Sequence, residues 1–260
     1  MKIYVKQEDI KKVNYLNGKE SIDVIFEDIS DNETVVNFID FSEANKINFN
    51  FKENQNFNLV NILTSKTEQN LTLNFNLQTK TNINAFFLNL NESSSTINHN
   101  LNLLGALSKI NYVGSSLSFG KQLKKDIILS SHKNKRTFSN VKTFSIAKDY
   151  SVQELSCTSA IEQGMKKSQA HQELRLLVFD KTAKAYSDPI LLINENDIEA
   201  SHANAVGNID KNELFYLNAR GLNDNEAKKL ICMGYFNEVL NSIKFKNIKE
   251  EIIKNIERKL

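Results

Sequence analysis

Residues 71–77 read LTLNFNL, and residues 97–103 read INHNLNL. In both stretches an apolar side chain alternates with a polar one, and residues 47–51 (INFNF) repeat the pattern. A period of two is typical of β-strands that bury one face. Similar but shorter runs occupy residues 22–26, 35–41, 57–62 and 110–113. We therefore expect a series of short strands from residue 21 to about residue 137.

The connections between these strands favour a solenoid over a fold made of hairpins. Tight hairpin dipeptides are nearly missing, apart from Asn17-Gly18. Inward positions are aliphatic or Phe and outward ones are mostly Asn, Thr and Ser, which suits stacked rungs with like residues above like. Because the chain has one proline and eight glycines, we expect asparagine to occupy the turns. The sequence predicts a mainly β fold, a right-handed parallel β-helix, with a β-sandwich as the alternative.

A helical pattern follows the strands. Asp210 is a helix-capping residue before an apolar stretch, and Gly221 is placed to end that helix. Asn223 caps a second helix, and a third, highly charged helix is expected from about residue 247 to residue 260. The apolar positions of the second helix lie on roughly one face: Ala227, Leu230, Ile231, Gly234, Tyr235 and Leu240.

Three parts of the chain follow from these patterns. We expect a short N-terminal segment over residues 1–20, a β-helix core over residues 21–207 and a helical region over residues 208–260.

Composition excludes several classes of protein. The 33 basic and 31 acidic residues give a net charge of +2, so no overall field draws the chain to nucleic acid or to an anionic membrane. No apolar stretch approaches the ~20 residues that span a bilayer, and no signal peptide is recognised. Two cysteines cannot form a disulfide framework. We therefore expect a cytoplasmic protein that binds neither membranes nor nucleic acid.

Catalytic motifs are missing from the sequence. It contains no phosphate-binding glycine-rich loop, no G-x-G-x-x-G and no H-E-x-x-H. His99 alternates with the apolar residues around it, so it is expected to point into the core. Cys157 is also predicted to be an inward packing residue, and Cys232 to be a structural residue of the second helix. Taken alone, these residues leave the function open.

Residues 188–239 carry a specific ordered pattern, DPILLINENDIEASHANAVGNIDKNELFYLNARGLNDNEAKKLICMGYFNEV. This stretch resembles the C-terminal end of the SufB/SufD family, the scaffold proteins of SUF iron–sulfur cluster assembly. The family pattern is matched by Pro189, Leu191, Ile193, Asp197, Ile198, Ser201, His202, Gly207, Ile209, Asp210, Leu214, Phe215, Tyr216, Leu217, Arg220, Gly221, Leu222, Ala227, Leu230, Ile231, Gly234, Glu238 and Val239, with Phe236 one position late.

The resemblance is to the SufD branch. Leu217 stands where SufB-like chains carry cysteine, and Ser201-His202 replaces their Glu-His-Glu. Glu173 falls roughly where SufB-like chains place the cysteine that is essential for cluster assembly, so this chain cannot supply that thiolate. From the resemblance we expect the family's usual helical N-terminal region to be absent or reduced to the first twenty residues.

The family resemblance implies a mechanism and partners. A SufB-like paralogue joins through the ends of the two β-helices, and the helical tail carries a SufC-like ABC ATPase. His202 then lies beside the nascent cluster as a metal ligand, with Glu173 as a secondary oxygen ligand or as a solvated carboxylate. On this resemblance we expect the chain itself to be no enzyme and to bind no permanent cofactor. A transient iron–sulfur cluster is expected at the subunit interface, and a homodimer is possible in isolation.

The resemblance also implies where the ATPase binds. Residues at the elbow between the first two helices are the candidates: Phe215, Tyr216, Arg220 and Gly221. The second helix is expected to turn its apolar face to the end of the β-helix, so the tail also caps the solenoid.

Two other functions remain open from the residues. A carbohydrate-active β-helix enzyme would need charged residues clustered on one outward strip, and that strip is mainly Asn, Thr and Ser. A nucleic-acid-binding protein would use the helix–Gly–helix at residues 211–243 and the Lys-rich last helix. Glutamates interleave with those lysines at residues 250, 251 and 257.

Overall fold

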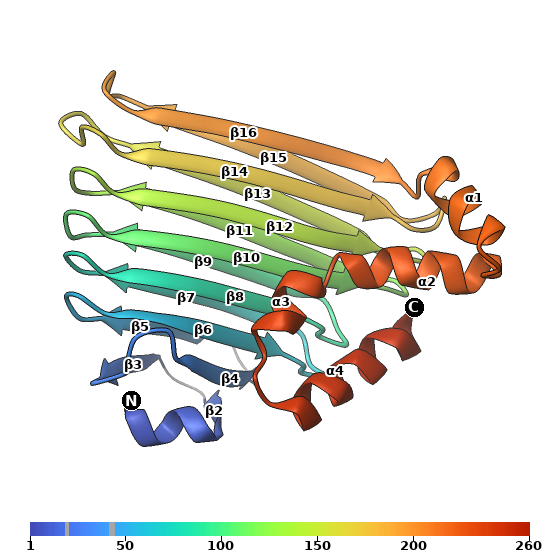
Figure 1. Ribbon diagram of the computed structural model, residues 1–260, viewed down its shortest axis with the longest axis horizontal. Coiled ribbons are helices and arrows are strands. Elements are labelled where there is room, and N and C mark those ends of the chain that lie inside the picture. Colours follow the sequence, from blue (N-terminus) through green and yellow to red (C-terminus); the bar gives the residue numbers. More distant parts are fainter. Residues whose placement is uncertain (19–20, 42–44) are drawn as a thin grey trace.

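The protein folds as a flattened parallel solenoid with a helical tail along one side (Figure 1). The computed structural model describes residues 1–18, 21–41 and 45–260. Each rung gives one strand to each of two eight-stranded sheets, and every strand pairing is parallel. The predicted parallel β-solenoid is therefore confirmed, and the sandwich alternative is wrong.

The two sheets are named here by the numbering of their strands. The odd sheet contains β1 (Lys2–Lys6), β3 (Ile22–Glu27), β5 (Asn45–Phe51), β7 (Gln69–Leu77), β9 (Ser95–Leu103), β11 (Leu123–His132), β13 (Val152–Ile161) and β15 (Lys184–Ile193). The even sheet contains β2 (Val13–Gly18), β4 (Thr34–Phe41), β6 (Asn56–Leu63), β8 (Asn82–Asn89), β10 (Lys109–Ser118), β12 (Phe138–Ala147), β14 (Gln169–Val178) and β16 (Glu199–Asn208). A short 3-10 helix, η1 (Gln7–Lys11), joins β1 to β2.

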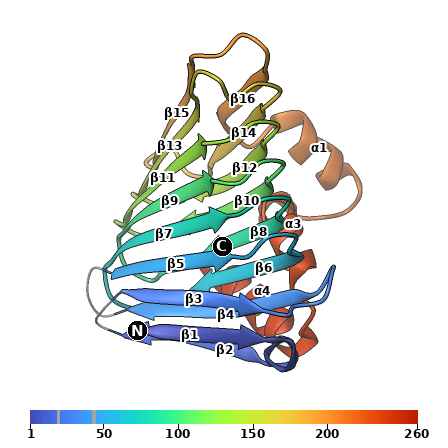
Figure 2. The same ribbon diagram turned by 90° about the vertical axis from the view of Figure 1, so that its left-hand side faces the viewer.

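The solenoid begins earlier than the sequence suggested. The segment 1–20 was expected to precede the array, but β1 pairs with β3 and β2 pairs with β4 (Figure 2). Val5 and Leu16 are each 1% exposed, so this first rung shares the common core. The alternating patterns of β1 and β2 are too short to be recognised in the sequence. Pairing with β3 and β4 of the next rung stabilises both strands. Residues 19 and 20 lie outside the described part of the chain, and the division into three domains stays a prediction.

Like side chains stack inside the first half of the solenoid. Phe49 pairs with Phe75 in register, and their ring centroids lie 5.1 Å apart. Phe26 stacks on Phe51 at 5.0 Å. Offset aromatic pairs of this kind add about 0.5–1.5 kcal/mol beyond the burial of their area. The apolar members of each alternating run therefore form one continuous core.

Asparagine forms ladders on the outer faces rather than filling the turns. The Asn74 side-chain amide donates to Asn48 Oδ1 at 2.7 Å, and Asn100 donates to Asn74 Oδ1 at 2.8 Å. Apart from glycines, the left-handed residues in the described ranges include only two asparagines, Asn32 and Asn54. The prediction that asparagine occupies the turns is therefore mostly wrong. An amide both donates and accepts, so stacked rungs bond it to its own kind above and below.

The rungs lengthen along the chain. Asn48 bonds to Asn74, 26 residues on, whereas His171 bonds to Ser201, 30 residues on. Strands grow from 5 residues in β1 to 10 in β16. Each rung therefore repeats the same two-strand arrangement, but the number of residues in a rung is not constant.

The tail contains four helices, α1 (Lys211–Ala219), α2 (Asp224–Gly234), α3 (Asn237–Ser242) and α4 (Lys246–Lys259). Asn223 makes the predicted capping box with Glu226, and Gly221 has φ +97, as its position after the first helix predicts. The expected second helix is divided into α2 and α3 after Gly234. Leu230 was predicted on the buried face, but it is 53% exposed.

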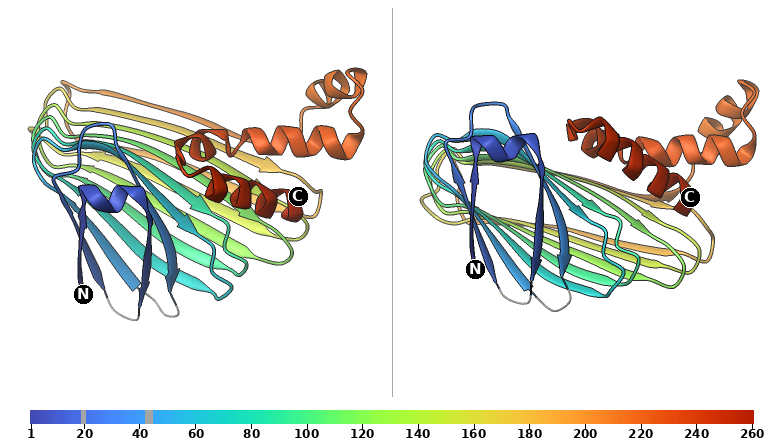
Figure 3. Two further views of the ribbon diagram at one scale, coloured as in Figure 1. Left: turned by 60° about the horizontal axis from the view of Figure 1, so that its bottom comes forward. Right: turned by 90° about the horizontal axis from the view of Figure 1, so that it is seen from below.

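The tail packs on the side of the solenoid, not on its end (Figure 3). Cys232, Phe236 and Leu240 contact apolar residues that point outward from the even sheet, including Val60 and Ile146. Tyr235 accepts a hydrogen bond from Ser115 through its carbonyl at 3.0 Å. The expectation that the tail caps the end is therefore wrong. The outer face of the even sheet is apolar under these helices, so covering it removes more apolar surface from water.

We predict that Asn74→Ala lowers the free energy of unfolding by about 1–2 kcal/mol, because it removes two ladder hydrogen bonds. Urea denaturation measures the change. Asn98→Ala is the matched control, because Asn98 shares the outer face of the odd sheet but makes no ladder bond among the described residues. An equal loss in both variants would show that the ladder adds nothing.

Candidate functional site

The last rung, β15 and β16, is open to solvent. Within the described residues no further strand or helix covers it, and both strands are the terminal members of their sheets. Tyr186 and Leu192 on β15 are each 54% exposed, and Val206 on β16 is 44% exposed. A cleft of about 740 Å³ at this end is lined by Lys125, Ile127, Glu154, Leu155, Ser156, Ala185, Tyr186, Ser187, Asp188 and Val206.

His202 lies at the mouth of the solenoid interior. It pairs in register with Gln172 of β14, whose side-chain amide donates to Ser159 of the opposite sheet and therefore points inward. Register partners on neighbouring strands point the same way. Two residues further on, Asn204 donates to the carbonyl of Ser187 across the interior at 3.5 Å. His202 is exposed, and no further rung of the described chain covers it.

Glu173 lies on the other face of the even sheet. It is the neighbour of inward Gln172, so its side chain points outward, and its carboxylate pairs with Arg175 Nε at 2.7 Å. In the next strand its register partner is Ala203 rather than His202. The structure therefore does not bring the two predicted cluster-assembly residues, His202 and Glu173, to one place.

Neither cysteine is poised to act as a thiolate. Cys157 is buried inside the solenoid, and Cys232 is a buried residue of α2 that packs against the even sheet, as the sequence predicted. Burial raises the pKa of each thiol to about 12. Over residues 1–18, 21–41 and 45–260, no group of three or more His, Cys, Asp or Glu side chains could hold a metal ion.

The first tail helix projects from the body as an arm. None of the residues of α1 is buried, and Phe215 and Tyr216 are 73% and 56% exposed. Arg220 lies over the Tyr216 ring at 5.2 Å and donates to its hydroxyl at 2.8 Å. Gly221 then allows the left-handed turn into α2. The four predicted docking residues thus lie together at one exposed elbow.

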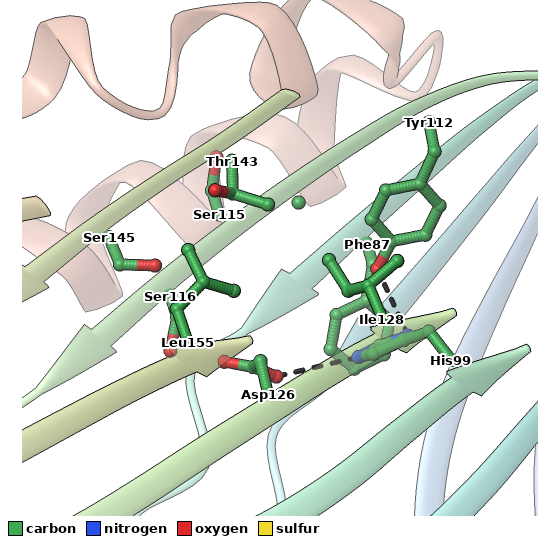
Figure 4. A pocket seen from close by; sticks show the side chains of 11 residues that line it. Phe87, His99, Tyr112, Ser115, Ser116, Asp126, Ile128, Thr143, Ser145 and Leu155 are labelled. Carbon is green, nitrogen blue, oxygen red and sulfur yellow. Dashed lines mark hydrogen bonds and ion pairs between the residues drawn. The ribbon is translucent and has the colours of Figure 1, made fainter. Parts of the chain in front are cut away.

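A polar network fills the interior below the open end (Figure 4). Tyr112 hydroxyl lies 3.0 Å from His99 Nδ1, and His99 Nε2 lies 3.4 Å from Asp126. Gln153 donates to the other Asp126 oxygen at 3.0 Å. The adjoining cavity of about 10 Å³ is the size of one water molecule. His99 is in the core as predicted.

The sequence analysis missed the other members of this interior network. Asp126 shares its strand parity with inward Ile128, and that alternation is the signal that could have found it.

Lys124 is the most deeply buried charged side chain of this interior. Its amine donates to the carbonyl of Leu117 at 2.7 Å and lies near Asn89. The amine is fully buried and pairs with no carboxylate within the described residues. Burial lowers the pKa of Lys124 from 10.5 to about 7, with Lys259 lowering it further and Asp126 opposing the shift.

Comparison with known proteins agrees with this architecture. The family described as "SUF system FeS cluster assembly, SufBD core domain" matches residues 20–235. The SufD protein of Bacillus subtilis is 39% identical over 100 residues, which cover 38% of this chain and 23% of the relative. SufD of Escherichia coli is 30% identical over 84 residues, covering 32% and 20%. A SufBD family protein of Mycobacterium leprae is 37% identical over 87 residues, covering 33% and 22%.

The parallel solenoid and the family match together define a β-solenoid protein of the SufBD core type. The chain belongs to the SufB/SufD family. Its matched stretches span only about a fifth of the curated relatives. No helix of the described chain is both long and apolar enough to cross a bilayer.

We predict that Lys124→Met changes how stability depends on pH. Folding releases the Lys124 proton between about pH 7 and 10.5. As the pH rises through that window, the cost of burying this amine falls by up to about 1.4 kcal/mol per pH unit. Below about pH 7 the cost of the buried charge is fully present. The advantage of the variant over the wild type should therefore be larger at about pH 6 than at about pH 9.

Urea denaturation at both pH values measures this difference. Lys109→Met, which removes an exposed lysine, is the control and should show the same small effect at each pH. A pH-independent effect of Lys124→Met would contradict the prediction.

Proposed function

We propose that this chain is a non-catalytic scaffold subunit of a SUF iron–sulfur cluster assembly complex. The observation that carries the proposal is His202, an inward-facing histidine at the uncovered last rung of the solenoid. Membership of the SufB/SufD family indicates that the group to be bound is a nascent iron–sulfur cluster. The open rung offers a place where a second subunit would enclose that cluster.

The chemistry of His202 suits a transient ligand. A neutral imidazole nitrogen binds iron. Because one histidine cannot hold a cluster, the other ligands would come from a partner. The nascent cluster is cargo and leaves the complex. Glu173 would act only from the outer face, where Arg175 already pairs with it.

The partner proposed for the open end is a SufB-like paralogue. Edge strands β15 and β16 offer unpaired backbone groups, and Tyr186, Ile190 and Leu192 offer exposed apolar surface beside them. Such an edge is suited to another solenoid end. A second copy of this chain can compete for it when the paralogue is missing.

The partner proposed for the arm is a SufC-like ATPase. Phe215, Tyr216 and Arg220 belong to the residue types that dominate binding energy at interfaces. Their helix follows β16 directly and contains no buried residue, so much of its surface is open to a partner. Affinity purification of the tagged chain from its own cells should recover both partners, and recovery of the chain alone would contradict both docking proposals.

We predict that His202→Ala abolishes cluster assembly and leaves the fold intact. The side chain is exposed, so the change in stability should stay within about 0.5 kcal/mol. Complementation of a deletion strain measures function, and thermal unfolding measures the fold. His171→Ala is the matched control, because His171 lies one rung below but points outward to Ser201. Full complementation by His202→Ala would remove His202 from the site.

We predict that Phe215→Ala weakens binding of the ATPase about 30-fold, the effect of losing a central aromatic contact worth about 2 kcal/mol. Calorimetric titration of the chain with the purified ATPase measures the affinity. Tyr15→Ala is the control, because Tyr15 is 71% exposed on β2, far along the solenoid from the arm. Equal affinities for the wild type and Phe215→Ala would place the docking surface elsewhere.

A further inference from the structure

Gln172 lies directly beneath His202 in the inward column of the even sheet. The two residues pair in register on β14 and β16. Neighbouring strands lie about 4.8 Å apart, so their side chains are within reach of each other. Gln172 is 3% exposed, whereas His202 above it is open to solvent.

The orientation of the Gln172 amide is fixed by two contacts. Its Nε2 donates to Ser159 Oγ at 2.8 Å and to the carbonyl of Ile190 at 3.1 Å. A backbone carbonyl only accepts, so the reversed amide would place two oxygens against each other. The nitrogen must therefore face Ile190, and Oε1 is the free end.

Gln172 Oε1 is a buried acceptor that receives no hydrogen bond from the residues the structure describes. A buried polar atom left without a partner costs about 1–3 kcal/mol, so such an atom calls for a donor. His202 is the in-register residue of the rung above, and its ring carries an N–H in the neutral form. Glu173 is excluded as an alternative support for His202, because it points to the outer face.

We propose that Gln172 is a positioning residue for His202. Its Oε1 accepts a hydrogen bond from one ring N–H and holds the neutral imidazole in a single tautomer. The other ring nitrogen then presents its lone pair toward the open end, where the cargo would bind. Outer partners of this kind orient metal-binding histidines in many proteins. The role toward iron rests on the proposed function, whereas the hydrogen bond and the tautomer do not.

The test is the tautomer of His202 in the full chain, without iron or partner. Long-range proton–nitrogen spectra of ¹⁵N-histidine protein distinguish the two neutral forms when recorded at about pH 8, above the ordinary histidine pKa. The wild type should show one dominant tautomer. Gln172→Met keeps the volume but removes the acceptor, so both tautomers should appear.

Gln153→Met is the matched control, since it removes another buried inward amide that does not lie beneath His202. It should leave the His202 tautomer unchanged. An unchanged tautomer in folded Gln172→Met overturns the proposal. A wild-type His202 that shows the mixture of a free histidine also overturns it, and this result needs no folded variant.

The two proposals can fail separately. A single tautomer together with full complementation by His202→Ala would refute the assembly role of His202 and leave the positioning role of Gln172 standing. If His202→Ala abolishes assembly but the tautomer is mixed, the reverse holds. If both hold, Gln172→Met should weaken iron binding at the assembled interface by about 10-fold or more.

Discussion

The in-register parallel stacking of rungs is the constraint on which the rest of this structure depends. It places Phe49 on Phe75 inside and Asn74 between Asn48 and Asn100 outside. Each residue type is stabilised by its own kind, because apolar rings share a dry interior and amides both donate and accept. A polar residue at an inward position must then find a partner within the interior, as His99, Asp126 and Gln153 do.

The same constraint determines the candidate site. Side-chain direction passes unchanged from one strand to the strand stacked on it, so His202 faces inward because Gln172 does. By the same rule Glu173 faces outward, where Arg175 pairs with it. The last rung has a neighbour on one side only. An inward residue is covered by the next rung elsewhere in the solenoid. On the last rung, His202 faces inward and is still accessible to a partner.

Local patterns in the sequence were sufficient for the parallel solenoid, the capping box at Asn223 and the inward direction of His99. They were insufficient where the outcome depends on contacts between distant segments. The tail covers the side of the solenoid because residues such as Val60 meet Phe236, more than a hundred positions later. The relation of Glu173 to His202 depends on the register across a turn, and alternation within one strand does not reveal it. Gln172 was missed because a buried glutamine between apolar residues looks like ordinary packing.

The gradual lengthening of the rungs has a consequence for how the chain reaches this state. In an array of identical repeats, any rung can lie on any other, and a chain can skip a unit or exchange units with a second molecule. Here one rung has 26 residues and another has 30, so exchanging them would change the length of chain between their strands. The length of a rung therefore helps to specify its place in the stack. A rung stacked out of order would leave residues that pair with no neighbouring strand. The increase in rung length thus disfavours stacking in the wrong order, and no particular side-chain contact is needed for this effect.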